Sequence, residues 1–294
     1  MRVLVTGAQG MLGFVLVAYL QTEHQVCGVD QQDFDIAERA AVERAFRQWR
    51  PQFVFHLAAY TDVDGCEANS SRAEQVNALG TLNVARACAD IGARLLYVST
   101  DYVFDGRGKR PHREDDSPNP LSVYGLTKLR GERYVQALVA GHVIVRSSWL
   151  YGPGGKNFVT TILKLAKQGA DLRVVADQIG SPTYTRHLAL ALVGLLGRGV
   201  GGVFHVTGSG SCSWFEFAEA IVRSAGAPRV GVIPITTKES GRLARRPAFS
   251  VLENRRLAGT GLAELPHWRE GLAQYCEEIR SESIGHQDGS TPSV

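Results

Sequence analysis

The chain has 294 residues, 44% of them hydrophobic and 21% charged, and its formal net charge of +3 is too small to indicate a nucleic-acid-binding protein. No apolar segment approaches the roughly 20 residues of a membrane-spanning helix, and the first residues read as a strand rather than a secretory leader, so we expect a cytoplasmic protein without membrane contact. The five cysteines are scattered without zinc-ligand spacing, which predicts free thiols.

The first half of the sequence alternates short β-branched segments with longer helical ones. These strands lack polar alternation, which is typical of the buried strands of a parallel sheet. The expected strands are residues 2–6, 25–30, 53–57, 94–99 and 142–146, and the expected helices are residues 11–20, 37–49, 71–92 and 124–139. This order predicts an α/β fold with a doubly wound parallel sheet of the Rossmann type.

After about Tyr151 the pattern loosens, and glycine and proline become frequent. Expected helices (158–168, 214–225 and 268–279) alternate with short strands (173–175 and 203–206), which we interpret as a smaller lobe. The sequence therefore predicts a larger domain over 1–151 to which some later segments return, a lobe over 152–280, and a disordered tail over 281–294 that lacks an apolar pattern.

A glycine-rich turn joins the first strand to the first helix. Its glycines, Gly7, Gly10 and Gly13, have the spacing G-x-x-G-x-x-G. Glycine at the turn allows a pyrophosphate to approach the helix N-terminus, and the last glycine allows the helix to pack closely on its strand. The motif at this junction predicts that the larger domain binds a dinucleotide.

An acidic residue, Asp30, ends the second strand, where a carboxylate can accept hydrogen bonds from the ribose hydroxyls of a bound adenosine. A 2′-phosphate would be repelled there, and Gln31 and Gln32 provide no cation. The pattern favours NADH and leaves NADPH open. Asp35 and Ile36 could contact the adenine, although Asp35 could equally cap the following helix.

Tyr124 and Lys128 lie four residues apart on an expected helix, so their side chains share one face. An ammonium beside a phenol favours the phenolate, so Lys128 is expected to lower the pKa of Tyr124 and make it a usable proton donor. Thr100 ends the preceding strand, at the sheet edge where ligands bind in such folds. We predict that these three residues are catalytic; the alternative is a solvated helix face.

Together these segments resemble the dTDP-4-dehydrorhamnose reductases of the extended short-chain dehydrogenase/reductase family. The matching blocks are residues 6–13, 57–61, 99–106, the Tyr124–Lys128 pair, 146–151, 177–183 and 245–247, within a resemblance that spans residues 1–278. The resemblance implies reduction of the C4 keto group of dTDP-4-dehydro-L-rhamnose by NADH or NADPH. It also implies that the lobe binds the nucleotide-sugar.

The resemblance further implies roles for individual residues. Those expected at the cofactor are Gly7, Gly10, Met11, Leu12, Asp30, Asp35, Ile36, Ala58, Ala59, Tyr60, Thr61, Tyr124 and Lys128. Tyr124 is expected to protonate the keto oxygen, and Lys128 to support it and to hydrogen-bond the nicotinamide ribose. Those expected at the substrate are Thr100, which hydrogen-bonds the keto oxygen, together with Asp101, Trp149 and Arg245.

A local basic cluster consists of Lys238, Arg242, Arg245 and Arg246. Arginine binds phosphate oxygens through two hydrogen bonds at once, so the cluster suits a diphosphate bridge; a solvated basic face is the alternative. Trp149 could likewise belong to the core instead of packing on the substrate.

One departure from the family concerns metal binding. Some members bind Mg²⁺ between two subunits through acidic residues, and here Val15 and Arg186 occupy those positions. A hard cation needs oxygen ligands, so the sequence predicts no metal and a monomer.

The same fold also supports other functions. A 4,6-dehydratase typically carries Asp-Glu after the threonine, whereas Tyr102 follows Asp101 here. A 4-epimerase or another nucleotide-sugar 4-ketoreductase would use the same tyrosine and lysine. A non-catalytic regulatory subunit of the same fold is disfavoured by the intact catalytic residues. The exact sugar and nucleotide base stay open.

Overall fold

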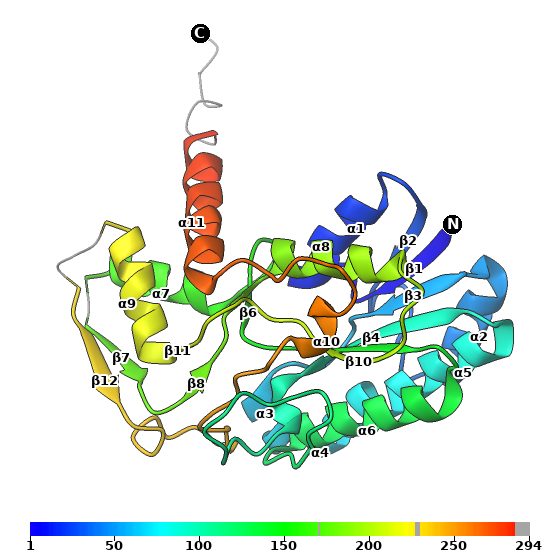
Figure 1. The fold of residues 1–294 in the computed structure, drawn as a ribbon, viewed down its shortest axis with the longest axis horizontal. Helices are drawn as coiled ribbons and strands as arrows, with labels where there is room; N and C mark the ends of the chain where they lie inside the picture. Colours follow the sequence, from blue (N-terminus) through cyan, green and yellow to red (C-terminus); the bar gives the residue numbers. More distant parts are fainter. Residues whose placement is uncertain (170, 227–229, 286–294) are drawn as a thin grey trace, which may run out of the picture.

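The computed structural model describes residues 1–169, 171–226 and 230–285 (Figure 1). A six-stranded parallel sheet lies at its centre in the order β10-β5-β4-β3-β1-β2. The strands are β1 (Arg2–Thr6), β2 (Gln25–Val29), β3 (Phe53–His56), β4 (Arg94–Thr100), β5 (Val143–Ser147) and β10 (Gly202–His205). The predicted doubly wound fold is confirmed. The strand order reverses between β1 and β3, and ligands bind at such a point in sheets of this kind.

Helices cover both faces of the sheet (Figure 1). One face carries α1 (Met11–Leu20) and α8 (Thr185–Leu196), and the other carries α2 (Arg39–Trp49), α5 (Thr81–Ile91) and α6 (Val123–Leu138). Alternate residues of β1 point to opposite faces of the sheet. Val3 and Val5 pack in the core beneath α1 and α8, whereas Leu4 packs in the core beneath α2 and α5. This double burial explains why the strands are apolar throughout.

The smaller lobe has a core of its own, rich in aromatic residues. Buried Tyr151 contacts Tyr184, Phe217 and Tyr275 through their rings. The lobe contains α7 (Phe158–Lys167), α9 (Trp214–Ser224), α11 (Trp268–Gly285), the parallel pair β7 (Leu172–Val175) and β12 (Val232–Ile235), and the antiparallel pair β8 (Ile179–Gly180) and β11 (Cys212–Ser213). The pair β6 (Leu150–Tyr151) and β9 (Thr183–Tyr184) leads into it. The remaining helices are α3 (Val63–Ala68), α4 (Ser70–Ala73) and α10 (Arg255–Ala258).

The strand expected at 203–206 does not belong to the lobe, so this part of the prediction is wrong. The strand, β10, pairs with β5 in the central sheet, with Val203 opposite Ile144. Phe204 is buried in the core beneath α1 and α8. The α8 helix was not predicted at all. A short apolar strand carries no local sign of the sheet that it will join, and only contacts distant in sequence decide this.

The long helix expected over 71–92 is interrupted by a π-helical segment, Glu74–Gly80. Within it, buried Asn77 accepts a hydrogen bond from the Tyr60 amide at 2.8 Å and donates one to the Tyr60 carbonyl at 3.0 Å. Such wider turns often occur beside functional sites. Here the turn places an amide side chain that fixes the segment following β3.

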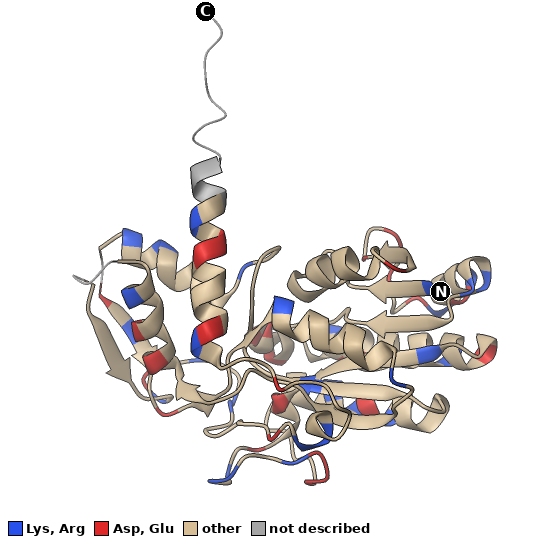
Figure 2. Cartoon of the chain, turned by 45° about the horizontal axis from the view of Figure 1, so that its top comes forward, with Lys and Arg blue, Asp and Glu red and all other residues tan. Residues whose placement is uncertain are grey.

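The C-terminal helix is longer than expected. Residues 281–284 contain neither glycine nor proline, so α11 continues to Gly285, past the predicted start of the tail; residues 286–294 lie outside the described residues. Acidic and basic residues are interspersed over the sheet domain and the lobe (Figure 2). All five cysteines are described and free. Within the described ranges, no helix has both the length and the apolarity to cross a membrane.

Candidate active site

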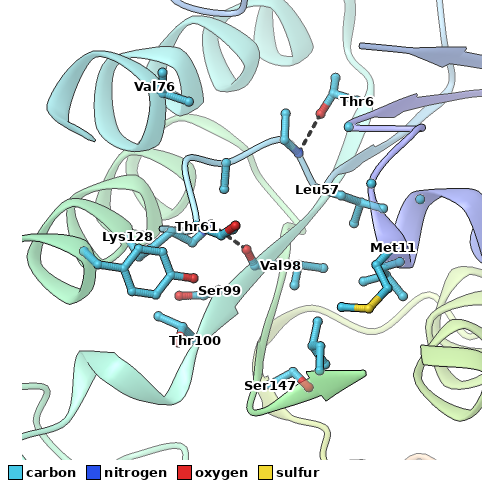
Figure 3. A pocket seen from close by; sticks show the side chains of 18 of the residues that line it. Thr6, Met11, Leu57, Thr61, Val76, Val98, Ser99, Thr100, Lys128 and Ser147 are labelled. Atoms are coloured by element: carbon cyan, nitrogen blue, oxygen red, sulfur yellow. Dashed lines mark hydrogen bonds between the residues drawn. The ribbon is translucent and has the colours of Figure 1, made fainter. Parts of the chain in front are cut away.

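A cavity of about 720 Å³ lies at the carboxyl ends of the central strands (Figure 3). Residues at or just beyond the ends of five strands line it: Thr6, Asp30, Leu57, Thr100 and Ser147. Cavities of this size are typical of small-molecule and cofactor sites. Of the residues predicted at the cofactor and the substrate, all but Tyr60 and Arg245 line this one cavity.

The glycine-rich turn forms one end of the cavity. Gly7 has φ of 72°, which favours glycine, and its carbonyl faces the first turn of α1. A Cβ atom on Gly13 would lie 2.1 Å from that carbonyl oxygen and 2.8 Å from the Ala8 Cα, so only glycine fits there. No side chain caps the start of α1 at Gly10. The amides of this helix end are therefore placed to bind an anion.

Asp30 braces the same turn. Its Oδ2 accepts a hydrogen bond from the Gln9 amide at 3.0 Å, and its Oδ1 accepts one from the Gln31 amide at 2.8 Å. The carboxylate thus holds the turn against the end of β2 as well as facing the cavity. Asp35 does not cap α2, which begins after Glu38; it accepts a hydrogen bond from the Ala37 amide at 2.9 Å.

A cation that the sequence analysis missed lies at this end of the cavity. Arg72 on α4 lines it, and its Nη1 lies 3.6 Å from Oδ2 of Asp35. The two residues that follow Asp30 in the sequence are glutamines and carry no charge. The π-helical segment and α4 bring Arg72 to the cavity from a different part of the chain, where no motif marks it.

The segment after β3 lies along the cavity. Ala58, Ala59 and Thr61 line it, whereas Tyr60 does not. Asn77 holds the Tyr60 backbone, and the Tyr60 side chain packs against the core beneath α2 and α5. Its neighbours therefore face the cavity and Tyr60 turns away.

Tyr124 and Lys128 enter the cavity from α6, whose start is capped by Ser122 through a 3.2 Å hydrogen bond from the Gly125 amide. Lys128 is buried, and its Nζ donates a hydrogen bond to the Val98 carbonyl at 2.8 Å (Figure 3). The Nζ also lies 4.2 Å from the centre of the Tyr97 ring. Burial lowers the pKa of Lys128 to about 7, and the charge of Glu132 opposes this change.

The pKa of Tyr124 differs from the sequence prediction. Burial, aided by the charge of Asp101, raises the pKa of Tyr124 above its ordinary value, so Lys128 does not lower it in this arrangement. The ammonium of Lys128 is hydrogen-bonded to the Val98 carbonyl instead. A raised pKa means that Tyr124 holds its proton at neutral pH.

Thr100 and Asp101 lie at the end of β4. Thr100 Oγ1 donates a hydrogen bond to Oδ1 of Asp101 at 3.0 Å and accepts one from the Tyr102 amide at 3.2 Å. Burial raises the pKa of Asp101 to about 7. Asp101 and Ser147 both line the cavity. Asp101 Oδ2 and Ser147 Oγ are buried and have no hydrogen-bond partner among the described residues. Such atoms suit the hydroxyl groups of a ligand.

Two stacked indoles contribute to the lining of the cavity. Trp149 has φ of 48°, uncommon for a residue other than glycine, and its ring lies 3.5 Å from that of Trp214 at an angle of 7°. Both line the cavity. Sequence reasoning missed Trp214. The capping-box residues Ser213 and Glu216 mark the start of α9, but they do not indicate which residue of its first turn faces a ligand.

The structure does not bring Arg245 to the cavity; its side chain is exposed. Two of its neighbours in the basic cluster, Arg242 and Arg246, hydrogen-bond Asp64 at 3.1 and 3.0 Å. Burial alone would raise the pKa of Asp64, but hydrogen bonds from Arg246 and Ala244 lower it to about 2. The cluster is therefore partly neutralised by a carboxylate that the sequence analysis had not connected with it.

Val15 and Arg186, which occupy the positions of acidic metal ligands in some family members, both have structural roles here. Val15 is buried in the core beneath α1 and α8, and Arg186 forms an ion pair with Glu278 on α11. Within the described part of the chain, no group of three His, Cys, Asp or Glu residues is placed to hold a metal ion.

The comparisons with known proteins agree with this geometry. The family model described as RmlD substrate binding domain matches residues 1–281. Spore coat polysaccharide biosynthesis protein SpsK of Bacillus subtilis is 42% identical over 281 residues, covering 95% of this chain and 98% of SpsK. A dTDP-4-dehydrorhamnose reductase of Streptomyces griseus is 42% identical over 280 residues, covering 93% of this chain and 92% of that protein.

The crystal structure of dTDP-4-dehydrorhamnose reductase from Bacillus anthracis in complex with NADP superimposes with a TM-score of 0.92 at 41% identity, covering 94% of this chain and 99% of that one. The family expected from the sequence motifs is therefore confirmed. By its match over nearly the whole length and by these relatives, the chain belongs to the RmlD substrate binding domain family.

Proposed function

We propose that this chain reduces the C4 keto group of dTDP-4-dehydro-L-rhamnose with NADH or NADPH and forms dTDP-L-rhamnose. One observation carries the proposal: a single cavity is lined by the glycine-rich turn at one end and by Thr100, Tyr124 and Lys128 farther along. A dinucleotide site that continues into a proton-donating site is the arrangement that a ketoreductase needs. The names of the relatives supply the substrate class.

The residues present fit a bound dinucleotide. Gly13 approaches the Gly7 carbonyl so closely that only glycine fits there. Because the glycines of the turn carry no side chains, a pyrophosphate can reach the amides at the start of α1. Asp30, Asp35 and Ile36 would hold the adenosine, and Ala58, Ala59 and Thr61 would line the remainder. When bound, the reduced nicotinamide supplies the hydride for the carbonyl carbon.

The chain supplies the proton and the positioning. Thr100 orients the carbonyl oxygen by a hydrogen bond. The Tyr124 hydroxyl, protonated at neutral pH because burial raises its pKa, gives its proton to that oxygen. The electron pair of the C–O π bond forms the new O–H bond, and the pair carried by the hydride forms the new C–H bond. The Lys128 ammonium stabilises the phenolate that remains. The buried Asp101 Oδ2 and Ser147 Oγ would accept or donate hydrogen bonds to sugar hydroxyls, and Trp149 would flank the ring.

The assay is consumption of reduced nicotinamide, followed by its absorbance, with purified protein and enzymatically prepared dTDP-4-dehydro-L-rhamnose. We expect substrate-dependent loss of absorbance with at least one of the two cofactors. A monomer is expected when the same sample is measured by light scattering, because no metal bridge is predicted.

Other outcomes would replace this proposal. Tightly retained NAD⁺ with no net consumption of reduced cofactor would indicate a 4-epimerase. Turnover with a different keto-sugar alone would indicate another nucleotide-sugar 4-ketoreductase. Absence of turnover beside an active control enzyme, together with binding to another protein, would indicate a regulatory subunit.

The choice between the two cofactors should depend on opposing charges at Asp30 and Arg72. Asp30→Asn removes a charge that repels a 2′-phosphate while keeping an acceptor for the Gln9 amide, so the NADPH affinity should rise about fivefold relative to NADH. Arg72→Gln should shift the ratio about fivefold the other way. The Kd values are measured by quenching of protein fluorescence.

The two variants serve as controls for each other, since general damage to the site would weaken both cofactors in both proteins. If the ratio of the Kd values for NADPH and NADH changes in the same direction in both variants, or in neither, these side chains do not determine the choice between the two cofactors.

A further inference from the structure

A buried ion pair lies directly behind the cavity wall. Glu132 on α6 and Arg146 on β5 are 1% and 3% exposed. Arg146 donates from Nε to Oε1 of Glu132 at 2.9 Å and from Nη2 to Oε2 at 2.7 Å. Buried charges are costly to desolvate, so a fully paired carboxylate here needs a reason beyond ordinary packing.

The same carboxylate holds the end of β4. Oε1 of Glu132 accepts a third hydrogen bond, from Ser99 Oγ at 2.6 Å. Ser99 and Arg146 are direct neighbours across β4 and β5. The next residue along each strand, Thr100 and Ser147, lines the cavity. Glu132 therefore ties one helix to two strands at the point where both strands reach the site.

The helix that Glu132 anchors is the one that carries the proposed proton donor. Lys128 lies one helical turn before Glu132, and Tyr124 one turn before Lys128. A shift of α6 along the sheet would move both side chains relative to Thr100. The three hydrogen bonds of Glu132 oppose such a shift.

Glu132 lies one helical turn after Lys128 on α6, and its negative charge favours the ammonium form of Lys128. The titratable groups around Lys128 are His56 on β3, Tyr97 on β4, Tyr124 and Glu132 on α6, and Arg146 lies beyond Glu132 on β5. Burial lowers the pKa of His56 to about 3 and raises the pKa of both tyrosines, so these three are neutral. Among the described residues, Glu132 is the group whose charge favours the ammonium form of Lys128.

We propose that Glu132 is a positioning residue for the proposed reduction: it fixes the Tyr124–Lys128 helix against Ser99 and Arg146 and favours the ammonium form of Lys128. The kinetic part of this inference rests on the proposed function. Its electrostatic part rests on the position of Glu132 on α6, which hydrogen bonds from Ser99 and Arg146 fix. Glu132 does not touch the substrate, and it acts through Lys128 and Ser99.

The electrostatic part is tested without substrate. The chain contains six lysines, so the Cε resonance of each isotope-labelled lysine can be followed against pH, and Lys128→Arg identifies the signal of Lys128. In Glu132→Gln, the titration of Lys128 should move to lower pH by about one pH unit, because an opposing charge at this range has effects of that size.

The kinetic part uses the same variant in the reductase assay. The alkaline limb of kcat should move to lower pH with the lysine titration, since activity needs the ammonium form. At neutral pH we expect kcat to fall about tenfold while KM for the keto-sugar changes little, because Glu132 touches neither ligand.

Glu132→Gln leaves Arg146 buried without its partner and could unfold the protein. The double variant Glu132→Leu with Arg146→Met removes both charges and avoids that problem. It should move the Lys128 titration in the same direction by a smaller amount, because the Arg146 cation, which disfavours the ammonium form, is lost together with the nearer carboxylate. Arg130→Gln is the matched control. Arg130 lies on the same helix and forms an exposed ion pair with Glu74 at 2.6 Å, so its loss should change neither the titration nor the kcat profile.

An unchanged Lys128 titration in the double variant overturns the electrostatic role. A shifted titration with an unmoved kcat profile overturns the role in the reaction. Wild-type protein that reduces no keto-sugar contradicts the proposed function separately, and the lysine titration then still decides whether Glu132 governs the charge of Lys128.

Discussion

Replacing Tyr124 by phenylalanine is expected to lower kcat by about a hundredfold or more, because the side chain that donates the proton loses its hydroxyl. The ring itself, which packs edge-on against Tyr102 with centres 5.8 Å apart, is retained, so the cavity keeps its shape. The Kd for NADH and NADPH should stay within about twofold of the wild-type value. Steady-state kinetics and fluorescence titration measure the two quantities.

The control for this variant is Tyr134→Phe, on the same helix. Tyr134 does not line the cavity, so loss of its hydroxyl should leave kcat unchanged. Turnover by the Tyr124 variant equal to that of the wild type would remove Tyr124 from the mechanism and direct attention to Asp101, whose pKa of about 7 also suits proton transfer.

Replacing Gly13 by alanine should abolish measurable cofactor binding at ordinary concentrations, a loss of about a hundredfold or more in affinity. The added Cβ would lie 2.1 Å from the Gly7 carbonyl oxygen, a backbone atom that cannot move without displacing the whole turn. Overpacking of this kind also costs about 1–3 kcal/mol of stability, so the Tm should fall. Fluorescence titration and thermal unfolding measure the two effects.

Gly197→Ala is a suitable comparison. Gly197 ends α8 with φ of −78°, and the nearest atom to an added Cβ is the Gly194 oxygen at 4.0 Å, so alanine fits without strain. Cofactor binding by the Gly13 variant that matches this control would show that the turn can relax, and the phosphate-binding role of the α1 N-terminus would have to be abandoned.

Sequence reasoning works best for features that local pattern determines. The apolar strands, the glycine turn and the Tyr124–Lys128 spacing each depend on a few adjacent residues, and all of them meet at the same edge of the sheet. Such a meeting follows from topology, because parallel strands present their carboxyl ends together.

Features that depend on distant contacts were missed. Arg72 lines the cavity from α4, which packs against α6, and Trp214 lines it from α9, where its ring stacks on Trp149. The pKa of Tyr124 was misjudged for a related reason. Burial of the phenol outweighs the nearby cation, and the extent of burial depends on the complete fold.

Because α8 and β10 follow the first five strands of the central sheet in the sequence, the ribosome synthesises them after those strands. The strands β1 to β5 are translated first, yet the apolar face beneath α1 is completed only when Leu188, Leu192 and Phe204 emerge. At a pace of roughly 5–20 residues per second, that delay lasts on the order of several seconds. During it the nascent chain already contains the glycine-rich turn but exposes part of the core that supports it. Chaperones that hold apolar segments should therefore engage this protein between the emergence of β5 and that of β10.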